Sequence, residues 1–124
     1  MQDSQKNFYK KNFGQFGEDK AVEYLQKQHY IILYRNYRTP YGEVDIVAID
    51  TATNEYVFCE VKTRKSARYM RACQAVNYKK QQKYITMAGY FIAQQNMDEL
   101  SIRFDVIEVY THTLNHIQAA FINE

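Results

Sequence analysis

The sequence predicts a single layered α/β (or α+β) domain in which helices flank a mixed central sheet, in the order α-β-β-β-α-β-β. Two segments repeat apolar residues at the spacing of amphipathic helices, and five segments are rich in the residues typical of strands. The length of 124 residues is that of one domain with a substantial core.

The first predicted elements are an arm and a helix. Residues 1–12 are polar and rich in lysine, and we expect a flexible arm that precedes a domain of residues 13–124. The segment 14–28 predicts a helix, because its small and apolar residues recur on adjacent stripes. Lys20 and Glu23 fall on the opposite side, which we expect to face solvent.

Three strands should follow this helix. The segment 30–38 is rich in isoleucine, leucine and tyrosine, which favours a strand. The only proline lies in the segment 39–42, which has the composition of a turn. The segments 43–50 and 56–62 alternate in the manner of strands with one buried face.

The second half begins with a basic stretch. The segment 63–74 has no apolar period and predicts a mobile loop, and 76–95 predicts a long helix. Five residues should share one face of this helix: Tyr84, Met87, Ala88, Phe91 and Gln95. The segment 101–110 predicts a strand, and 114–121 predicts a final strand or a short terminal element.

Composition excludes several classes of protein. No apolar run approaches the ~18 residues of a membrane span, and the N-terminus lacks the apolar core of a secretory signal. Two cysteines do not make a disulfide framework, so we expect a cytoplasmic protein. Cys59 alternates with valines and should be buried, and the three histidines do not have the spacing of zinc ligands.

Positive charge is concentrated in one segment. Residues 62–83 contain eight basic and no acidic residues, whereas the rest of the chain has eight basic and fourteen acidic residues. This segregation indicates a polyanion partner, although a solvated loop and helix face would give the same pattern. The candidate DNA-binding residues are Arg64, Lys65, Arg68, Arg71, Lys79, Lys80 and Lys83.

The second and third strands carry two carboxylates at matching positions. If Asp50 lies opposite Glu55 in an antiparallel hairpin, paired residue numbers have a constant sum, and Asp45 lies opposite Glu60. Their Cβ atoms would then be ~4.5–5.5 Å apart. Lys62 should project from the same face as Glu60.

Two adjacent carboxylates repel each other and need a compensating charge. A Mg²⁺ or Mn²⁺ ion fits, because such ions bind one or two carboxylates together with water and substrate phosphate. Lys62 could neutralise the pair without metal, and could stabilise charge on a scissile phosphate or orient the attacking water. The alternative is a surface ion-pair cluster on a solvated sheet face.

Glu18 is a fourth candidate. It lies on a stripe of the first helix with Ala21, Val22 and Leu25, so it should border the buried face. It could reach the carboxylate pair if the helix crosses that end of the sheet. Alternatively, Glu18 is a first-turn glutamate favoured by the helix dipole.

Several motifs together resemble a known nuclease core. The segments 42–48 (Gly-Glu-Val-Asp-Ile-Val-Ala) and 57–64 (Val-Phe-Cys-Glu-Val-Lys-Thr-Arg) resemble the D…ExK core of the PD-(D/E)xK nuclease superfamily, with Val44 where the superfamily's name has proline. The segments 14–21 and 34–38, together with Val76…Lys80 and 103–106 (Arg-Phe-Asp-Val), resemble the YraN-like family of bacterial proteins, which is similar to archaeal Holliday-junction resolvases.

The resemblance covers about residues 13–121 and implies a restriction-endonuclease-like fold. It implies that Glu18, Asp45 and Glu60 are metal ligands, and that all three act in catalysis together with Lys62. It also implies a Mg²⁺-dependent endonuclease that acts on DNA, including branched or structured DNA, and a homodimer, because paired cuts need two sites. The alternative function is a nucleic-acid-binding module in which the metal site is vestigial.

Overall fold

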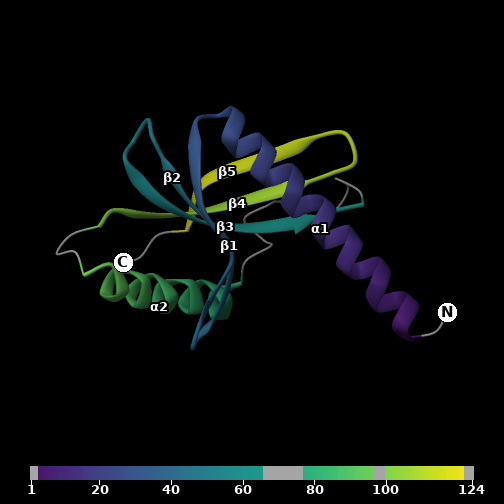
Figure 1. Cartoon of the computed structure of the whole chain (residues 1–124), viewed down its shortest axis with the longest axis horizontal. Coiled ribbons are helices and arrows are strands. Elements are labelled where there is room, and N and C mark those ends of the chain that lie inside the picture. Colours follow the sequence, from purple (N-terminus) through teal and green to yellow (C-terminus); the bar gives the residue numbers. More distant parts are fainter. Residues whose placement is uncertain (1–2, 66–76, 97–99, 122–124) are drawn as a thin grey trace.

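The structure is a computed structural model that describes residues 3–65, 77–96 and 100–121, with the backbone alone for residues 3–11 (Figure 1). Its elements follow the predicted order. They are α1 (Asp3–Lys27), β1 (Tyr30–Thr39), β2 (Gly42–Asp50), β3 (Glu55–Thr63), α2 (Tyr78–Gln95), β4 (Ile102–Val109) and β5 (Leu114–Phe121).

The five strands form one mixed sheet in the order β1-β2-β3-β4-β5. Neighbouring strands are antiparallel except β3 and β4, which are parallel and are connected through α2. Helices α1 and α2 lie on opposite faces of this sheet (Figure 1). The predicted α/β layout with a mixed central sheet is therefore confirmed.

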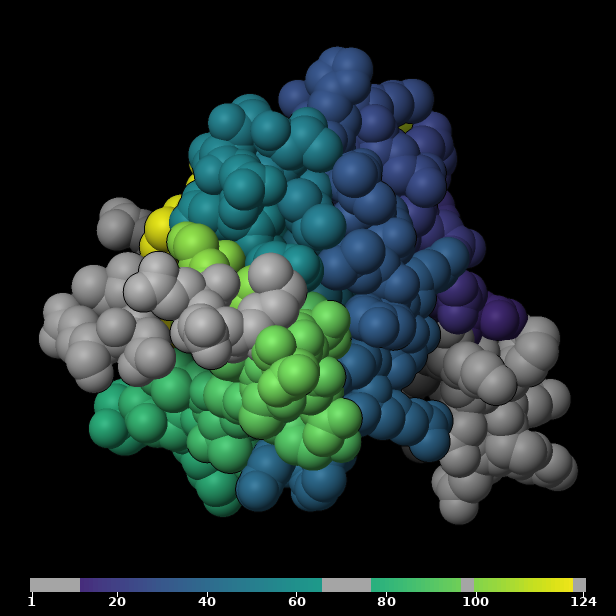
Figure 2. All heavy atoms as spheres, turned by 60° about the vertical axis from the view of Figure 1, so that its left-hand side comes forward, coloured from purple at the N-terminus to yellow at the C-terminus, as the bar shows by residue number. Residues whose placement is uncertain are grey.

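Each helix covers its own core. Ala21 and Leu25 of α1 pack against Ile46, Val57 and Ile107 on one face of the sheet. On the other face α2 contributes the residues Tyr84, Met87, Ala88 and Phe91, which the sequence placed on its buried side. Figure 2 shows the surface of α2 in green against the blue and teal surfaces of β1 and β2.

Helix α1 begins much earlier than predicted. The structure starts it at Asp3, so the arm expected at residues 1–12 is helical from residue 3 onward. Residues 3–13 contain no proline or glycine, so the sequence has no helix breaker in this segment. In Figure 1 this N-terminal part of α1 projects beyond the sheet.

The β2–β3 hairpin has the predicted register. Its pairs run from Asp50 opposite Glu55 to Ile46 opposite Cys59, which confirms the constant sum on which the carboxylate pairing was based. Cys59 is fully buried, as predicted, and this burial raises its pKa. Within the described residues, no helix has the length and apolar character needed to cross a membrane.

Gly17 marks the point where α1 approaches β3. A Cβ atom on Gly17 would lie 1.9 Å from Oγ1 of Thr63 and 3.0 Å from its Cβ. Only a residue without a side chain fits between the helix and the end of this strand. Glu18, the next residue, is thereby held against the same end of the sheet.

A buried ion network crosses the α1 side of the sheet and is centred on Arg103. The guanidinium donates to Asp105 through Nε at 2.9 Å, to Asp50 through Nη1 at 2.8 Å and to the hydroxyl of Tyr30 through Nη2 at 2.7 Å. His116 Nε2 lies 2.7 Å from the second Asp105 oxygen. The network thus joins β1, β2, β4 and β5.

Candidate active site

Glu60 lies at the centre of the candidate site, although its side chain is only 5% exposed. Lys62 Nζ is 3.1 Å from Glu60 Oε1, so the two residues share a face of β3 as alternation predicted. Two residues of α2 also reach Glu60: Lys80 donates to Oε1 and Tyr84 donates to Oε2. Both carboxylate oxygens therefore have donors from the protein.

Asp45 lies beside this cluster and contacts the backbone of β3. Its Oδ2 atom accepts a hydrogen bond from the amide of Val61 at 2.7 Å, next to the last described β2–β3 pair. The negative charge of Glu60 acts on Asp45, as do the charges of Lys80 and Glu18. The predicted site residues on β2 and β3 are therefore brought together.

The backbone of β1 is irregular opposite Asp45. The flanking pairs Arg35–Ile46 and Tyr37–Val44 place Asn36 opposite Asp45, and Asn36 has a φ of 53°. Asparagine tolerates this left-handed conformation better than most residues. Consecutive strand residues normally point to opposite faces, but here Arg35 Nε (2.9 Å) and Asn36 Nδ2 (3.0 Å) both donate to Glu18 Oε1.

Glu18 lies in the middle of α1 and is buried, with 9% of its surface exposed. Because the helix begins at Asp3, Glu18 does not lie in a first turn, and the helix-dipole explanation is wrong. Its carboxylate is held by Arg35 and Asn36, while its charge acts on Asp45. Glu18 therefore borders the site and is paired with protein groups there.

The two central carboxyl groups have opposite pKa shifts. Burial and the charge of Glu60 raise the pKa of Asp45 to about 7, despite the hydrogen bond from Val61. Burial also acts to raise the pKa of Glu60, but hydrogen bonds from Lys80 and Tyr84 and the charge of Lys80 outweigh it and lower that pKa. The pair thus favours one negative charge over two.

Comparison with known proteins identifies the family. The model of the uncharacterised protein family UPF0102 matches residues 17–109, from Gly17 through the carboxylates to the end of β4. The chain belongs to the UPF0102 family. The sequence motifs had indicated this YraN-like family, and that prediction is confirmed.

Relatives of this UPF0102 protein match along almost their whole length. A UPF0102 protein of Clostridioides difficile is 43% identical over 113 residues, covering 90% of this chain and 97% of the relative. One from Caldanaerobacter subterraneus is 40% identical over 123 residues, covering 94% and 99%. One from Clostridium botulinum is 44% identical over 110 residues, covering 88% of each chain. These three relatives therefore have about the same length as this chain.

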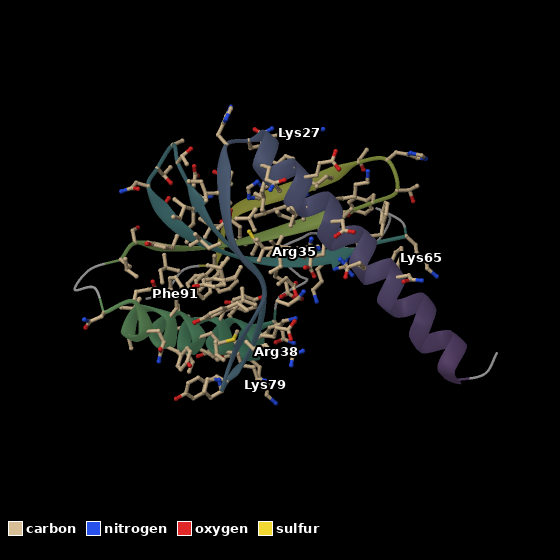
Figure 3. All side chains as sticks on the ribbon, viewed as in Figure 1. Lys27, Arg35, Arg38, Lys65, Lys79 and Phe91 are labelled. Carbon is tan, nitrogen blue, oxygen red and sulfur yellow. The ribbon has the colours of Figure 1, made fainter. Side chains whose placement is uncertain are left out.

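The basic residues of the UPF0102 protein fall into two groups. Lys65, Lys79 and Lys83 are exposed, and Figure 3 shows Lys79 pointing away from the sheet. Arg64 is 3.6 Å from the buried Glu108 on β4, and Lys80 is paired with Glu60. Arg68 and Arg71, and most of the loop predicted at 63–74, lie outside the described residues.

Sequence reasoning missed the inward role of Lys80 and Tyr84. The sequence pattern predicts Lys80 to be a phosphate-binding lysine and Tyr84 to be a core residue. The spacing did contain a signal, because Lys80, Tyr84, Met87 and Phe91 follow the i, i+4, i+7, i+11 pattern of one helix stripe. Lys80 is therefore the member of the basic segment that this stripe turns toward the sheet.

The raised pKa of Asp45 predicts a stability that depends on pH. Between pH 4 and 7 the unfolded chain loses this proton, from an ordinary pKa of 3.8, whereas the folded protein retains it up to about pH 7. The stability of the metal-free protein should therefore fall as pH rises through this window. Asp45→Asn should remove that loss and should raise the free energy of unfolding at pH 8 by up to about 4 kcal/mol.

Urea unfolding in the presence of a chelator at pH 4 and pH 8 measures this difference. Asp19→Asn is the control, because Asp19 is exposed and the hydrogen bond from Arg35 lowers its pKa. The control should not gain stability at pH 8. An equal effect of Asp45→Asn at both pH values would contradict the assignment of the proton to Asp45.

Proposed function

We propose that this UPF0102 protein is a divalent-metal-dependent endonuclease that hydrolyses DNA phosphodiesters. The observation that carries this proposal is the pair of neighbouring carboxyl groups of the half-buried Asp45 and the buried Glu60, with the ammonium group of Lys62 3.1 Å from Glu60 Oε1. Paired carboxylates with a lysine are suited to phosphoryl chemistry, since they can hold a cation and leave a positive group for the phosphate. The family name itself assigns no activity.

The residues present fit a Mg²⁺ or Mn²⁺ ion. Asp45 and Glu60 offer hard carboxylate oxygens, and the raised pKa of Asp45, which follows from burial and from Glu60, supports a need for added positive charge there. Among the described residues no three carboxylate, imidazole or thiol groups converge closely enough to hold one ion. We therefore infer that Asp45 and Glu60 are the main protein ligands; Glu18 as a ligand stays a prediction.

Each side chain then has a distinct role. The bound metal would supply charge neutralisation of the phosphate and a more acidic attacking water. Asp45 and Glu60 hold the ion, and Tyr84 fixes the orientation of Glu60 through its second oxygen. Lys62 donates to the scissile phosphate or orients the water that attacks phosphorus as the P–O bond breaks. Hydrolysis needs no other cofactor.

The proposed substrate is DNA, including branched or structured DNA. The exposed lysines Lys65, Lys79 and Lys83 belong to the basic segment 62–83, which begins at Lys62 in the carboxylate site. Such residues contact the phosphate backbone and place the strand without reading its sequence. A symmetric homodimer, which would provide two cuts across a junction, remains part of the proposal.

The direct test is cleavage of matched duplex, flap and four-way-junction DNA with Mg²⁺, with Mn²⁺ and with a chelator. We expect metal-dependent nicking of at least one substrate by the wild-type protein. Glu60→Gln should lose it, because this change weakens the metal ligand while keeping the size of the side chain. Cleavage that persists in the chelator, or in Glu60→Gln, would rule out this site as the active centre.

Lys79 and Lys83 give a prediction about binding alone. Lys79→Ala and Lys83→Ala should each weaken DNA binding and reduce the slope of log affinity against log salt by about one, because each removes one phosphate contact. Titrations of labelled DNA at several salt concentrations measure this slope. Glu23→Gln is a control on the other helix, and it should leave the slope unchanged because Glu23 is an exposed acidic residue.

A binding module without cleavage is the second candidate. It is favoured by the donors on both oxygens of Glu60, which leave the carboxylate satisfied within the protein. In that case the metal-free site would be a structural ion cluster, and DNA would bind through the exposed lysines. Salt-dependent binding with no metal-dependent cleavage of any tested DNA would support this candidate over the endonuclease.

A further inference from the structure

Lys80 places its ammonium group beside the two carboxylates that are proposed to bind the divalent ion. Its ammonium donates to Glu60 Oε1, and its charge also acts on Asp45. The Lys80 side chain is 39% exposed, so the ammonium lies at the boundary between the carboxylate pair and solvent. Lys79, its neighbour in the chain, is exposed.

The carboxylate has little free capacity while Lys80 is bound. Oε1 of Glu60 accepts a hydrogen bond from Lys80 and forms an ion pair with Lys62, and Oε2 accepts a hydrogen bond from the hydroxyl of Tyr84. Because a carboxylate oxygen has two acceptor positions, a divalent ion that binds Oε1 must displace Lys80 or Lys62. Lys80 is suited to leave, since its long side chain reaches solvent, whereas Tyr84 is only 1% exposed.

The start of α2 gives a second reason to assign Lys80 a role other than helix stability. Positive residues in a first helical turn oppose the helix dipole, which favours acidic residues there. The first turn of α2 has no acidic residue and contains Lys79 and Lys80, with Asn77 capping the amide of Lys80. The charge of Lys80 is instead compensated by Glu60 from β3.

We propose that Lys80 is an internal counter-cation that holds Glu60 in the metal-free protein and is displaced by the divalent ion. This inference rests on the proposed metal site. Lys80 lowers the affinity for metal, because its ammonium competes for Glu60 and repels a second cation. When the ion enters, the released ammonium stays next to Lys62 and becomes available to a substrate phosphate, so Lys80 acts as a positioning residue that couples metal loading to DNA binding.

The test measures Mn²⁺ affinity in the absence of DNA, by calorimetry and by electron paramagnetic resonance of free Mn²⁺. Lys80→Met keeps the aliphatic stem and removes the charge, and it should bind Mn²⁺ at least about tenfold more tightly than wild type. Lys80→Arg keeps the charge and should bind weakly, like wild type. Lys79→Met removes an equivalent charge from the exposed neighbour and should change the affinity by less than about twofold.

Two further variants secure the interpretation. Lys80→Gln gives a second neutral side chain in case Lys80→Met folds poorly, and it should also tighten Mn²⁺ binding. The double variant Glu60→Gln, Lys80→Met should lose the gain, which shows that the tighter site uses Glu60. Urea unfolding in a chelator should show lower stability for Lys80→Met than for Lys79→Met, because Asp45 and Glu60 lose their counter-charge.

The outcomes separate this inference from the proposed function. If wild type binds Mn²⁺ and the neutral Lys80 variants bind equally or more weakly, the counter-cation role is overturned and the metal site stands. If neither wild type nor any neutral variant binds Mn²⁺, the metal site and the counter-cation both fail. Tighter binding in the neutral variants, absent in Lys80→Arg, supports both.

Discussion

Lys62→Met should lower the rate of DNA cleavage by about a hundredfold or more, while DNA affinity changes little. Lys62 lies 3.1 Å from Glu60 Oε1 and is only partly exposed, so its charge is directed to the carboxylate site. In the proposed reaction, the positive charge of Lys62 lies next to the phosphate, where negative charge develops. This interaction is stronger in the transition state than in the bound ground state, so its loss slows cleavage more than it weakens binding.

The measurement compares single-turnover cleavage with binding by the same DNA at the same salt concentration. Lys79→Met is the matched control, since it removes the same charge from an exposed position and should weaken binding with little effect on the rate at saturating protein. If Lys62→Met weakens binding as much as Lys79→Met and leaves the saturated rate unchanged, Lys62 is a phosphate-binding residue only.

Asp105→Ala should lower the free energy of unfolding by about 3–5 kcal/mol, because it leaves buried charge without a partner. Asp105 is fully buried and accepts hydrogen bonds from Arg103, from the amide of Ala119 and from the His116 ring when Nε2 is protonated. Burial acts to raise its pKa, but His116 and Arg103 outweigh this and lower it, so the native state keeps the carboxylate charged.

Urea unfolding at neutral pH measures this loss. Glu43→Ala is the control, because the pair of Glu43 and Arg38 is 3.6 Å apart and both side chains are well exposed. Such surface pairs contribute about 0–1 kcal/mol, so the control should stay close to wild type. Similar stabilities for the two variants would mean that the Arg103 network contributes no more than a surface pair.

Local pattern and hairpin register were enough to predict most of the fold. Period-two alternation and the turn between Asp50 and Glu55 fixed the β2–β3 pairing, since a shift by one residue would have exposed the buried face. The apolar stripe of α2 was predicted for the same reason, because its buried residues follow the helical period. The predicted start of α1 at residue 14 was wrong, because that prediction relied on an apolar stripe, whereas the structure begins the helix at Asp3.

The candidate site was predictable only in part. Asp45, Glu60 and Lys62 lie on adjacent strands, so local geometry brings them together. Lys80 and Arg103 act through contacts between elements distant in the chain, which periodicity within one element cannot assign to a partner. The left-handed backbone of Asn36 turns two consecutive residues to Glu18, which the alternation rule excludes.

The close approach of Gly17 to Thr63 has a consequence for genetic screens of this protein. Even an alanine at residue 17 would clash with Thr63, so α1 should move away from β3 and carry Glu18 with it. Inactivating substitutions should therefore accumulate at residue 17, as we also expect at Asp45 and Glu60. Gly14 and Gly89 have open space where a Cβ would lie and should tolerate alanine. Gly17 has no functional group to lose, so intolerance of substitutions there would mean that the protein requires the short distance between α1 and β3.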